Sequence, residues 1–268
     1  MKTISFLSDY GLDDEFVGVC HAVMARIAPG SRLIDLTHGV PRHAVRRGAL
    51  ILRNALPYVE PGVHLAVVDP EVGGERRAVA LRVAQDNRLL VGPDNGLLAL
   101  AAQRFGGVVE AVDIGLSAFR LEPVASTFHG RDIFAPVAAR LAAGAELLEA
   151  GEPIDGAELC ALELPRPRIE NGEVVAHAIS VDRYGNVALD VDHADLIESG
   201  LRLGRAVELD VGGRRLQAHY AKTFADVEPD EPLVYEDAWR TLALAVNRGS
   251  AAEALGLSAD DELRIRPA

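Results

Sequence analysis

Short apolar runs alternate with longer stretches of helical spacing over most of the first 165 residues. The runs are rich in β-branched and aliphatic residues and end in polar turn residues, which is typical of buried strands. With their turns they occupy 3–11, 32–40, 62–70 and 77–83, and stretches with the three-to-four-residue period of helices occupy 14–30, 44–59 and 128–144. Residues 88–106 combine a strand, a turn and a helix. This alternation predicts an α/β domain with a largely parallel central sheet.

The pattern changes near residue 165, where Pro165 and Pro167 precede short β-type runs broken by turn residues. Gly212-Gly213 between two such runs favours a hairpin. The alanines around 241–246 would permit a helix, but TLALAV followed by Asn-Arg-Gly fits a strand better, and 250–256 then reads as a short helix. We therefore predict two domains, an α/β domain over 1–164 and a smaller, mainly β domain over 165–268, joined at the prolines.

The turn between two predicted strands in AVVDPEVGGERRAVALRV, residues 66–83, carries many charges, among them Asp69 and Arg76. A solvated hairpin with a surface ion pair is one explanation, because Gly-Gly favours turns and charged side chains favour water. The alternative is a functional site, since ligands of open α/β sheets bind beyond the carboxyl ends of the strands. Other strands of the domain also end in polar turns, namely Ser8-Asp9-Tyr10-Gly11, Thr37-His38-Gly39 and Pro93-Asp94-Asn95-Gly96.

Composition limits the classes of partner. A formal net charge of −13 argues against a nucleic-acid surface and against binding to anionic membranes, both of which require basic patches. No stretch approaches the length of an apolar membrane span, and the N-terminus lacks a signal peptide's apolar core. The two cysteines, Cys20 and Cys160, are too few for a disulfide framework. We expect a cytoplasmic protein.

Common catalytic and nucleotide-binding motifs are missing. The first polar turn lacks the G-x-G-x-x-G pattern, and neither a P-loop nor a G-x-S-x-G nucleophile motif occurs in the chain. No spacing of His, Cys and Asp requires a metal, so neither a metal site nor a cofactor is expected. His38 and His43 can equally be structural, pocket-lining or catalytic.

Seven motifs occur together in an order found in one known family. They are FLSDYGLDDEFVG, IDLTHGV, VVDPEVGGERR, VGPDNGLL, TFHGRDIFAPVAARL, VDRYGNVALDV and LALAVNRGSAA. In these motifs, from Ser8 to about Ala252, the chain resembles the S-adenosyl-L-methionine (SAM) hydrolases, also called SAM hydroxide adenosyltransferases, which are related to fluorinases and chlorinases. The resemblance implies an α/β N-terminal domain, a β-barrel-like C-terminal domain, and a homotrimer with each site between two subunits.

The resemblance also implies a reaction and a catalytic centre. Family members bring together an Asp, an Arg seven residues later and a distant His, which match Asp69, Arg76 and His129. The implied reaction is attack of water or hydroxide on the ribose C5′ of SAM, which yields adenosine and L-methionine. The reference pKa of a histidine side chain, about 6.5, suits His129 as a base near neutrality. Asp69 would orient the water, Arg76 would hold Asp69 and lower the pKa of the water, and the proton acceptor stays open.

Further residues match substrate-binding positions of the family. Asp9 matches the acid that grips the ribose hydroxyls, and the others match positions near adenine or the methionine end: Asp182, Tyr184, Asn186, Phe224 and Arg248. Tyr184 and Phe224 could alternatively be ordinary barrel-core residues, and Asp9 could cap the next helix.

One segment departs from the family pattern. Where a hydroxyl residue and a glycine are usual, this chain has Ala238 and Arg240, so Trp239 or Arg240 would have to replace the methionine contact. A protein that binds adenosine or SAM without turnover is therefore a second hypothesis, and a SAM-dependent halogenase a more distant third. A carboxylate at Asp69 disfavours the third, because it would repel a halide about 4 Å away by roughly 4 kcal/mol.

Overall fold

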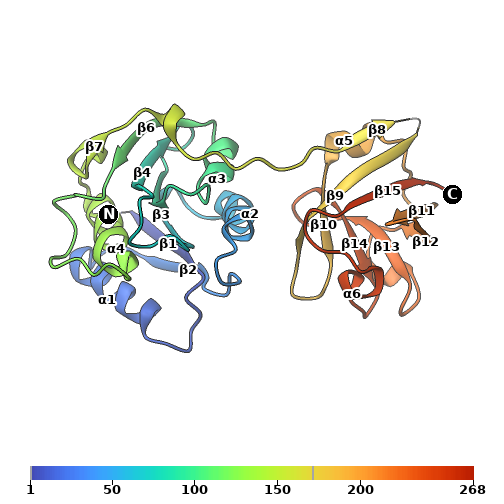
Figure 1. Ribbon diagram of the computed structural model, residues 1–268, viewed down its shortest axis with the longest axis horizontal. Helices are drawn as coiled ribbons and strands as arrows, with labels where there is room; N and C mark the ends of the chain where they lie inside the picture. Colours follow the sequence, from blue (N-terminus) through green and yellow to red (C-terminus); the bar gives the residue numbers. More distant parts are fainter. Residues whose placement is uncertain (1, 171) are drawn as a thin grey trace. The chain divides into compact units, whose positions relative to one another are not determined.

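The computed structural model describes residues 2–170 and 172–268. The chain divides into two compact units, residues 1–162 and residues 163–268 (Figure 1). Residues 160–167, which include Pro165 and Pro167, form neither helix nor strand. Among the described residues, none of the helices is both long enough and apolar enough to cross a membrane.

The first unit is built on a seven-stranded mixed sheet with the order β2-β1-β3-β5-β4-β6-β7. The strands are β1 (Thr3–Ser8), β2 (Leu33–Thr37), β3 (Gly62–Val67), β4 (Ala78–Val83), β5 (Leu89–Pro93), β6 (Val108–Asp113) and β7 (Glu152–Pro153). β1 pairs in parallel with β2 and β3, and β3 pairs in parallel with β5. The predicted parallel sheet is confirmed for these four strands, whereas β4, β6 and β7 pair antiparallel with their neighbours.

Helices cover both faces of this sheet. They are α1 (Phe16–Ile27), α2 (Val45–Ala55), α3 (Ala99–Arg104) and α4 (Ala135–Ala143), with short turns at Leu56–Tyr58, Gly130–Phe134, Leu147–Glu149 and Gly156–Glu158. α1 packs with α4 on one face, and α2 packs with α3 on the other (Figure 1). The core between the sheet and α1 with α4 is apolar and includes Phe6, Met24 and Phe134, all almost fully buried.

The charged turn at residues 68–77 is not a hairpin, because β3 and β4 do not pair. β5 lies between them, parallel to β3 and antiparallel to β4. Residues 68–77 contain no helix, and they are too few for the crossover of about a dozen residues or more that would make β4 parallel to β3. β4 therefore starts beside the carboxyl end of the parallel strands, where β3 and β5 finish. The turn from β3 to β4 passes the carboxyl end of β5.

The second unit is a closed β-barrel. Its strands are β8 (Arg168–Glu170), β9 (Glu173–Val181), β10 (Val187–Asp192), β11 (Ala206–Val211), β12 (Arg214–Tyr220), β13 (Pro232–Glu236), β14 (Thr241–Val246) and β15 (Glu262–Pro267). The strand order β10-β14-β13-β12-β11-β15-β9-β8, with an additional pairing of β10 and β9, closes a ring of seven strands. The predicted mainly β character and the barrel implied by the resemblance are both confirmed.

Two local predictions for this unit are also confirmed. Gly212 and Gly213, both with positive φ, form the hairpin turn between β11 and β12. The ambiguous stretch at 241–246 is strand β14, followed by the short helix α6 (Ala251–Leu255). The remaining helical elements are α5 (His193–Glu198) and a single turn at Phe224–Asp226.

Candidate functional site

The polar turns of the first unit meet at one edge of its sheet. The N–H of Gly11 donates to the carbonyl of His38 at 2.8 Å, which joins the turns after β1 and β2. Asn95 Nδ2 donates to the carbonyl of Val68 at 2.9 Å, which joins the turn after β5 to the charged turn. The carboxyl ends of the four parallel strands thus gather their polar residues, as expected for open α/β sheets.

Asp69 and Arg76 form a bidentate ion pair at this edge. Arg76 Nε lies 2.9 Å from Asp69 Oδ1 and 3.1 Å from Oδ2, and Arg76 Nη2 also donates to Oδ2. Both side chains are only 5% exposed, so the explanation as a solvated surface pair is wrong. Two buried opposite charges with fork-like geometry hold each other in a fixed orientation.

His129 is the third member of this group. Arg76 Nη2 lies 2.8 Å from His129 Nδ1, and because a guanidinium can only donate, Nδ1 must be the unprotonated acceptor. Burial, assisted by the positive charge of Arg76, lowers the pKa of His129 from its ordinary value, so the ring is neutral at neutral pH. In that state the proton is on Nε2, which is a donor and not a base.

The turn that carries His129 is fixed by a buried carboxylate. Asp132, 2% exposed, accepts bonds from Arg131 Nε at 2.6 Å and from the backbone N–H of Ala125 at 2.8 Å. Burial alone would raise the pKa of Asp132, but these hydrogen bonds outweigh it and the pKa is lowered. An ionised Asp132 therefore ties the turn after His129 to the segment before it.

The charged turn approaches the same segment closely. Gly73 has φ of +78° and its backbone lies against the carbonyl of Ser126, so that a Cβ at this position would clash. Glycine is needed here for both the left-handed backbone and the close approach. The contact brings Asp69 and Arg76, on the charged turn, to the chain segment that leads to His129.

Tyr10 belongs to the same neighbourhood, although sequence reasoning did not single it out. Its ring packs against Phe6, Phe16 and Phe128, and burial, together with the charges of Asp69 and Asp9 among others, raises its pKa well above the ordinary value. Its hydroxyl lies so close to Gly130 that a Cβ there would clash with it. The signal in the sequence was the pair of motifs SDYG and HGRD, whose middle residues meet in space.

Asp9 does not cap α1, whose N-cap position is Glu15 and has no side-chain hydrogen bond. Its Oδ2 instead accepts the backbone N–H of His43 at 3.0 Å. His43 has φ of +65°, a strained conformation for a residue with a Cβ, at the approach to α2. One oxygen of Asp9 is thus fixed by the backbone, which orients the carboxylate.

An open hollow of about 650 Å³ adjoins part of the group. Arg76 and His129 line it together with Arg77, Asp113, Arg120 and Glu122, among others. Neither Asp9 nor Asp69 lines this hollow, so it does not by itself mark out the whole set of expected substrate contacts.

In the second unit, the expected Asp182 and Asn186 form the loop between β9 and β10. Asp182 Oδ1 accepts the backbone N–H groups of Tyr184 at 2.8 Å and of Asn186 at 2.9 Å. Asn186 Nδ2 donates to Asp182 Oδ2 at 2.8 Å. The carboxylate thus shapes the loop, and the loop presents Tyr184 to solvent.

The two aromatic residues expected to flank adenine are not core residues. Tyr184 is 77% exposed and Phe224 is 39% exposed, so their interpretation as barrel core is wrong. Phe224 packs against Tyr235 with ring centroids 5.1 Å apart. Burial, together with the charges of Asp182 and Asp237, raises the pKa of Tyr235 to about 12. Tyr235 thus supports the Phe224 ring from β13.

Ala238-Trp239-Arg240, the segment that departs from the family pattern, lies in the turn between β13 and β14. Asp237 Oδ1 accepts the N–H groups of Trp239 at 2.8 Å and of Thr241 at 3.0 Å, which closes the turn between β13 and β14. Arg240 has φ of +63°, the conformation that favours the glycine usual at this position. Trp239 is 46% exposed.

Arg248, the remaining expected binding residue, also has a positive φ, of +62°. It lies in the turn after β14, where the N–H of Gly249 donates to the carbonyl of Val246 at 3.0 Å. The structure thus brings Asp69 and His129 of the first unit together through Arg76, while the expected second-unit residues lie in loops and short turns between the strands.

Two family models match the chain. SAM hydroxide adenosyltransferase N-terminal domain matches residues 4–151, and SAM hydroxide adenosyltransferase C-terminal domain matches residues 176–264. A protein of Thermotoga maritima with a solved structure is similar over 98% of this chain and 99% of its own, with a TM-score of 0.91 and 35% identity.

Named relatives divide into two groups. A Salinispora tropica protein named (R)-S-adenosyl-L-methionine hydrolase is 48% identical over 98% of this chain and 97% of its own length. A fluorinase of an Actinoplanes species is 27% identical over 96% of this chain and 94% of its own length. The family-model matches and the 48% identity agree, and the chain belongs to the SAM hydroxide adenosyltransferase family.

Proposed function

We propose that the protein hydrolyses SAM to adenosine and L-methionine. The observation that carries this proposal is the buried group in which Arg76 contacts both Asp69 and His129. The relatives named (R)-S-adenosyl-L-methionine hydrolase support it, since they are more similar to this chain than the fluorinase is.

The reaction is a displacement at the ribose C5′. A C5′–O bond forms to water, the C5′–S bond breaks, and its electron pair neutralises the sulfonium, so that methionine leaves as a neutral thioether. The leaving group needs no general acid, and no resident cofactor is required for this step. A site with little water favours the reaction when the nucleophile is hydroxide-like, because its charge and that of the sulfonium disappear together.

The three residues have separate roles in this proposal. His129 donates Nε2–H to the oxygen of the water, because its Nδ1 lone pair is taken by Arg76. A carboxylate oxygen of Asp69 aligns the water and accepts its proton as the C5′–O bond forms, so that the attacking oxygen becomes hydroxide-like. Arg76 is a positioning residue that holds both partners.

In this proposal the substrate contacts come from the first unit of one subunit and from the second unit of a neighbouring subunit. Asp9, fixed by the His43 N–H, would accept bonds from the two ribose hydroxyls. Phe224 and Tyr184 would stack on adenine. The remaining second-unit residues would contact the adenine edge and the methionine end: Asp182, Asn186, Trp239 and Arg248.

We propose a homotrimer, in which the second unit of a neighbouring subunit completes each site. The resemblance suggests this arrangement, and the exposed aromatic side chains of the second unit fit it, since aromatic residues are enriched in binding surfaces. We also propose a cytoplasmic location, which agrees with two free cysteines, one of them exposed.

A binder without turnover is the second candidate. Ala238 favours it, because a hydroxyl that would hold the methionine end is missing. Arg240 does not replace this contact in the structure, because its Nε donates to Glu236 Oε1 at 3.1 Å. The buried Asp69–Arg76–His129 group favours turnover, because a binder has no need of a buried charged group beside the water.

The proposed activity predicts adenosine and methionine in equal amounts when the purified protein is incubated with SAM. Because the proposed step uses only side chains and water, a chelator should leave the rate unchanged. The (R) form named for the relatives should be offered separately from the other sulfonium form, with adenosine measured by chromatography. Adenosine binding without products from either form would establish the binder, and a halogenated nucleoside formed in chloride or fluoride would establish the halogenase.

Phe224→Ala and Tyr184→Ala should each weaken adenosine binding by roughly 1–3 kcal/mol, if both rings stack on the base. The thermal unfolding midpoint should change little, because both side chains are exposed in the second unit. Isothermal titration calorimetry with adenosine measures the loss. Leu203→Ala, which removes an apolar side chain that is 57% exposed on the same unit, is the matched control. Unchanged adenosine affinity in both aromatic variants would remove these rings from the site.

A further inference from the structure

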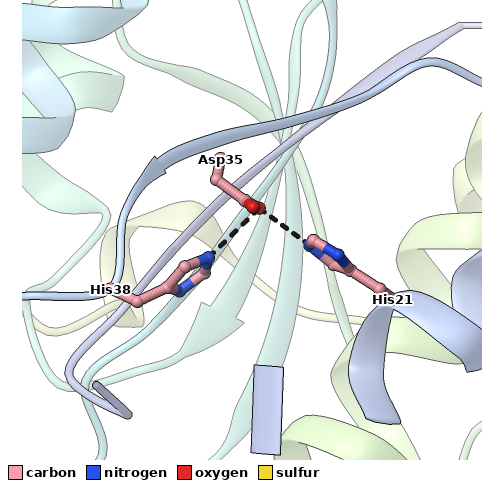
Figure 2. Close-up of side chains that lie close together, drawn as sticks. All are labelled: His21, Asp35 and His38. Carbon is pink, nitrogen blue, oxygen red and sulfur yellow. Dashed lines mark hydrogen bonds and ion pairs between the residues drawn. The ribbon is translucent and has the colours of Figure 1, made fainter. Parts of the chain in front are cut away.

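Two histidines and an aspartate gather at the edge strand of the first unit's sheet (Figure 2). His21 lies on α1, Asp35 on β2, and His38 in the turn after β2. Asp35 Oδ1 lies 2.8 Å from His21 Nε2 and 3.1 Å from His38 Nε2. One ligand atom from each residue falls within 4.8 Å of the others, and in the described part of the chain only these residues form such a group.

His38 contributes the most informative nitrogen. Its side chain is only 2% exposed, and its Nε2 is buried without a hydrogen bond. Asp35 Oδ1 is close enough for an ion pair, but it lies off the direction in which Nε2 could donate or accept a hydrogen bond. A buried polar atom without a partner is destabilising, so the arrangement calls for a third group between the nitrogen and the oxygen.

The far side of the His38 ring is already fixed. Ser8 Oγ lies 2.8 Å from Nδ1, and Phe6 packs against the ring with centroids 4.7 Å apart. When Nδ1–H donates to Ser8, Nε2 carries a lone pair that no hydrogen-bond donor occupies. Metal-bound histidines have this arrangement, in which a second partner on the other nitrogen fixes the tautomer and the ring.

We propose that His21, Asp35 and His38 form a binding site for a divalent transition-metal ion, with Zn²⁺ as the ion that fits best. Neutral imidazole nitrogens and one carboxylate oxygen are ligands that zinc prefers. Ligand atoms around a tetrahedral zinc ion are about 3.3 Å apart. The distances of 2.8 and 3.1 Å to Asp35 Oδ1 are close to this value, and the ligand nitrogens of the two histidines lie within 4.8 Å of each other. A carboxylate oxygen bound to the same ion lies to one side of the imidazole lone pair, which matches Asp35.

The site would be open on one side. The side chains of His21 and Asp35 are 32% and 41% exposed, so water can fill the fourth position. An ion here would connect α1, the end of β2 and, through Ser8, the end of β1. Its expected effect is to stabilise the first unit. The inference is independent of the proposed hydrolysis, which uses other side chains.

The alternative is a network in which each histidine shares a proton with Asp35. It is satisfied for His21, whose Nε2 is in hydrogen-bond geometry with Asp35 Oδ1. It is not satisfied for His38, whose Nε2 lacks that geometry. The two explanations differ in whether zinc binds more tightly than at other surface histidines.

The test is calorimetric titration of the chelator-treated, full-length protein with zinc sulfate. The wild-type protein should bind about one equivalent tightly. His21→Ala and Asp35→Asn should each weaken that binding by about 100-fold or more, since losing a partner behind a ligand already costs 10- to 100-fold. His193→Ala, which removes a half-exposed histidine paired with Glu236 on the barrel, is the control and should bind zinc like the wild type.

Thermal unfolding gives a second readout that does not depend on activity. Zinc at about 100 times its dissociation constant should raise the unfolding midpoint of the wild-type first unit by about 5 °C and leave that of His21→Ala unchanged. Equal zinc affinity in the wild type and His21→Ala would overturn the proposal. So would a loss of stability in His21→Ala that is the same in zinc and in chelator, because that result belongs to the hydrogen-bond network.

Discussion

We expect Asp69→Asn to lower the turnover of SAM by a factor of about 10² to 10⁴ and to leave adenosine affinity almost unchanged. The amide keeps the size of the carboxylate, but it loses the charge that orients the water and takes its proton. It also weakens the pairing with Arg76, which holds both carboxylate oxygens. The nucleoside contacts expected from Asp9 and Phe224 are retained, so the loss should appear in kcat.

Single-turnover cleavage of SAM and calorimetric binding of adenosine separate these quantities. Glu75→Gln is the matched control, because it neutralises an exposed carboxylate in the same turn. If Asp69→Asn and Glu75→Gln cleave SAM at the wild-type rate, Asp69 has no part in the reaction. A parallel loss of adenosine affinity in Asp69→Asn would instead assign Asp69 to binding.

Arg76→Lys should lower kcat by about 10²-fold or more, even though it preserves the positive charge. A single ammonium cannot bind both oxygens of Asp69 and also donate to His129 Nδ1, as the guanidinium does. His129 would then no longer be held in the tautomer that donates from Nε2. Adenosine binding should remain close to that of the wild type, since Arg76 is placed at the reacting end.

The neighbouring arginine supplies the control for this prediction. Arg77 pairs with Asp94 and Glu158 and is 30% exposed, so Arg77→Lys changes the same chemistry one residue away. Arg76→Lys is expected to lose kcat and Arg77→Lys is not, with circular dichroism showing that both remain folded. Equal activity of the two variants would show that the fork geometry at Arg76 does not matter.

Local patterns predicted most elements of the fold, because apolar residues recur every three to four positions in a helix and form short runs in a buried strand. Strands β1 and β3, helices α1 and α4, and the hairpin at Gly212-Gly213 all follow from nearby residues. The antiparallel half of the first sheet did not, since the insertion of β5 between β3 and β4 is a long-range pairing with no local signal. A buried strand has the same kind of apolar run whether it pairs parallel or antiparallel with its neighbour.

The site was predictable only where motifs could be matched. Nothing local indicates that Asp69 and Arg76 meet His129, which is 53 residues beyond Arg76. Tyr10 was missed because its importance depends on the contact with Gly130. The same holds for His21, Asp35 and His38, whose spacing in the chain is typical of no metal motif and whose proximity depends on α1 packing beside β2.

The path of the charged turn past the end of β5 bears on how this family could change its chemistry. β3 and β4 are each held in register by β5 and not by each other. Residues other than Gly73 could therefore be exchanged between Asp69 and Arg76 while both strands keep their pairing. Such changes would alter the reach and charge of the reacting end at little cost to folding. The choice of nucleophile could therefore evolve in this turn while the strand pairing that stabilises the first unit stays the same. The turn is also a place where that choice can be engineered.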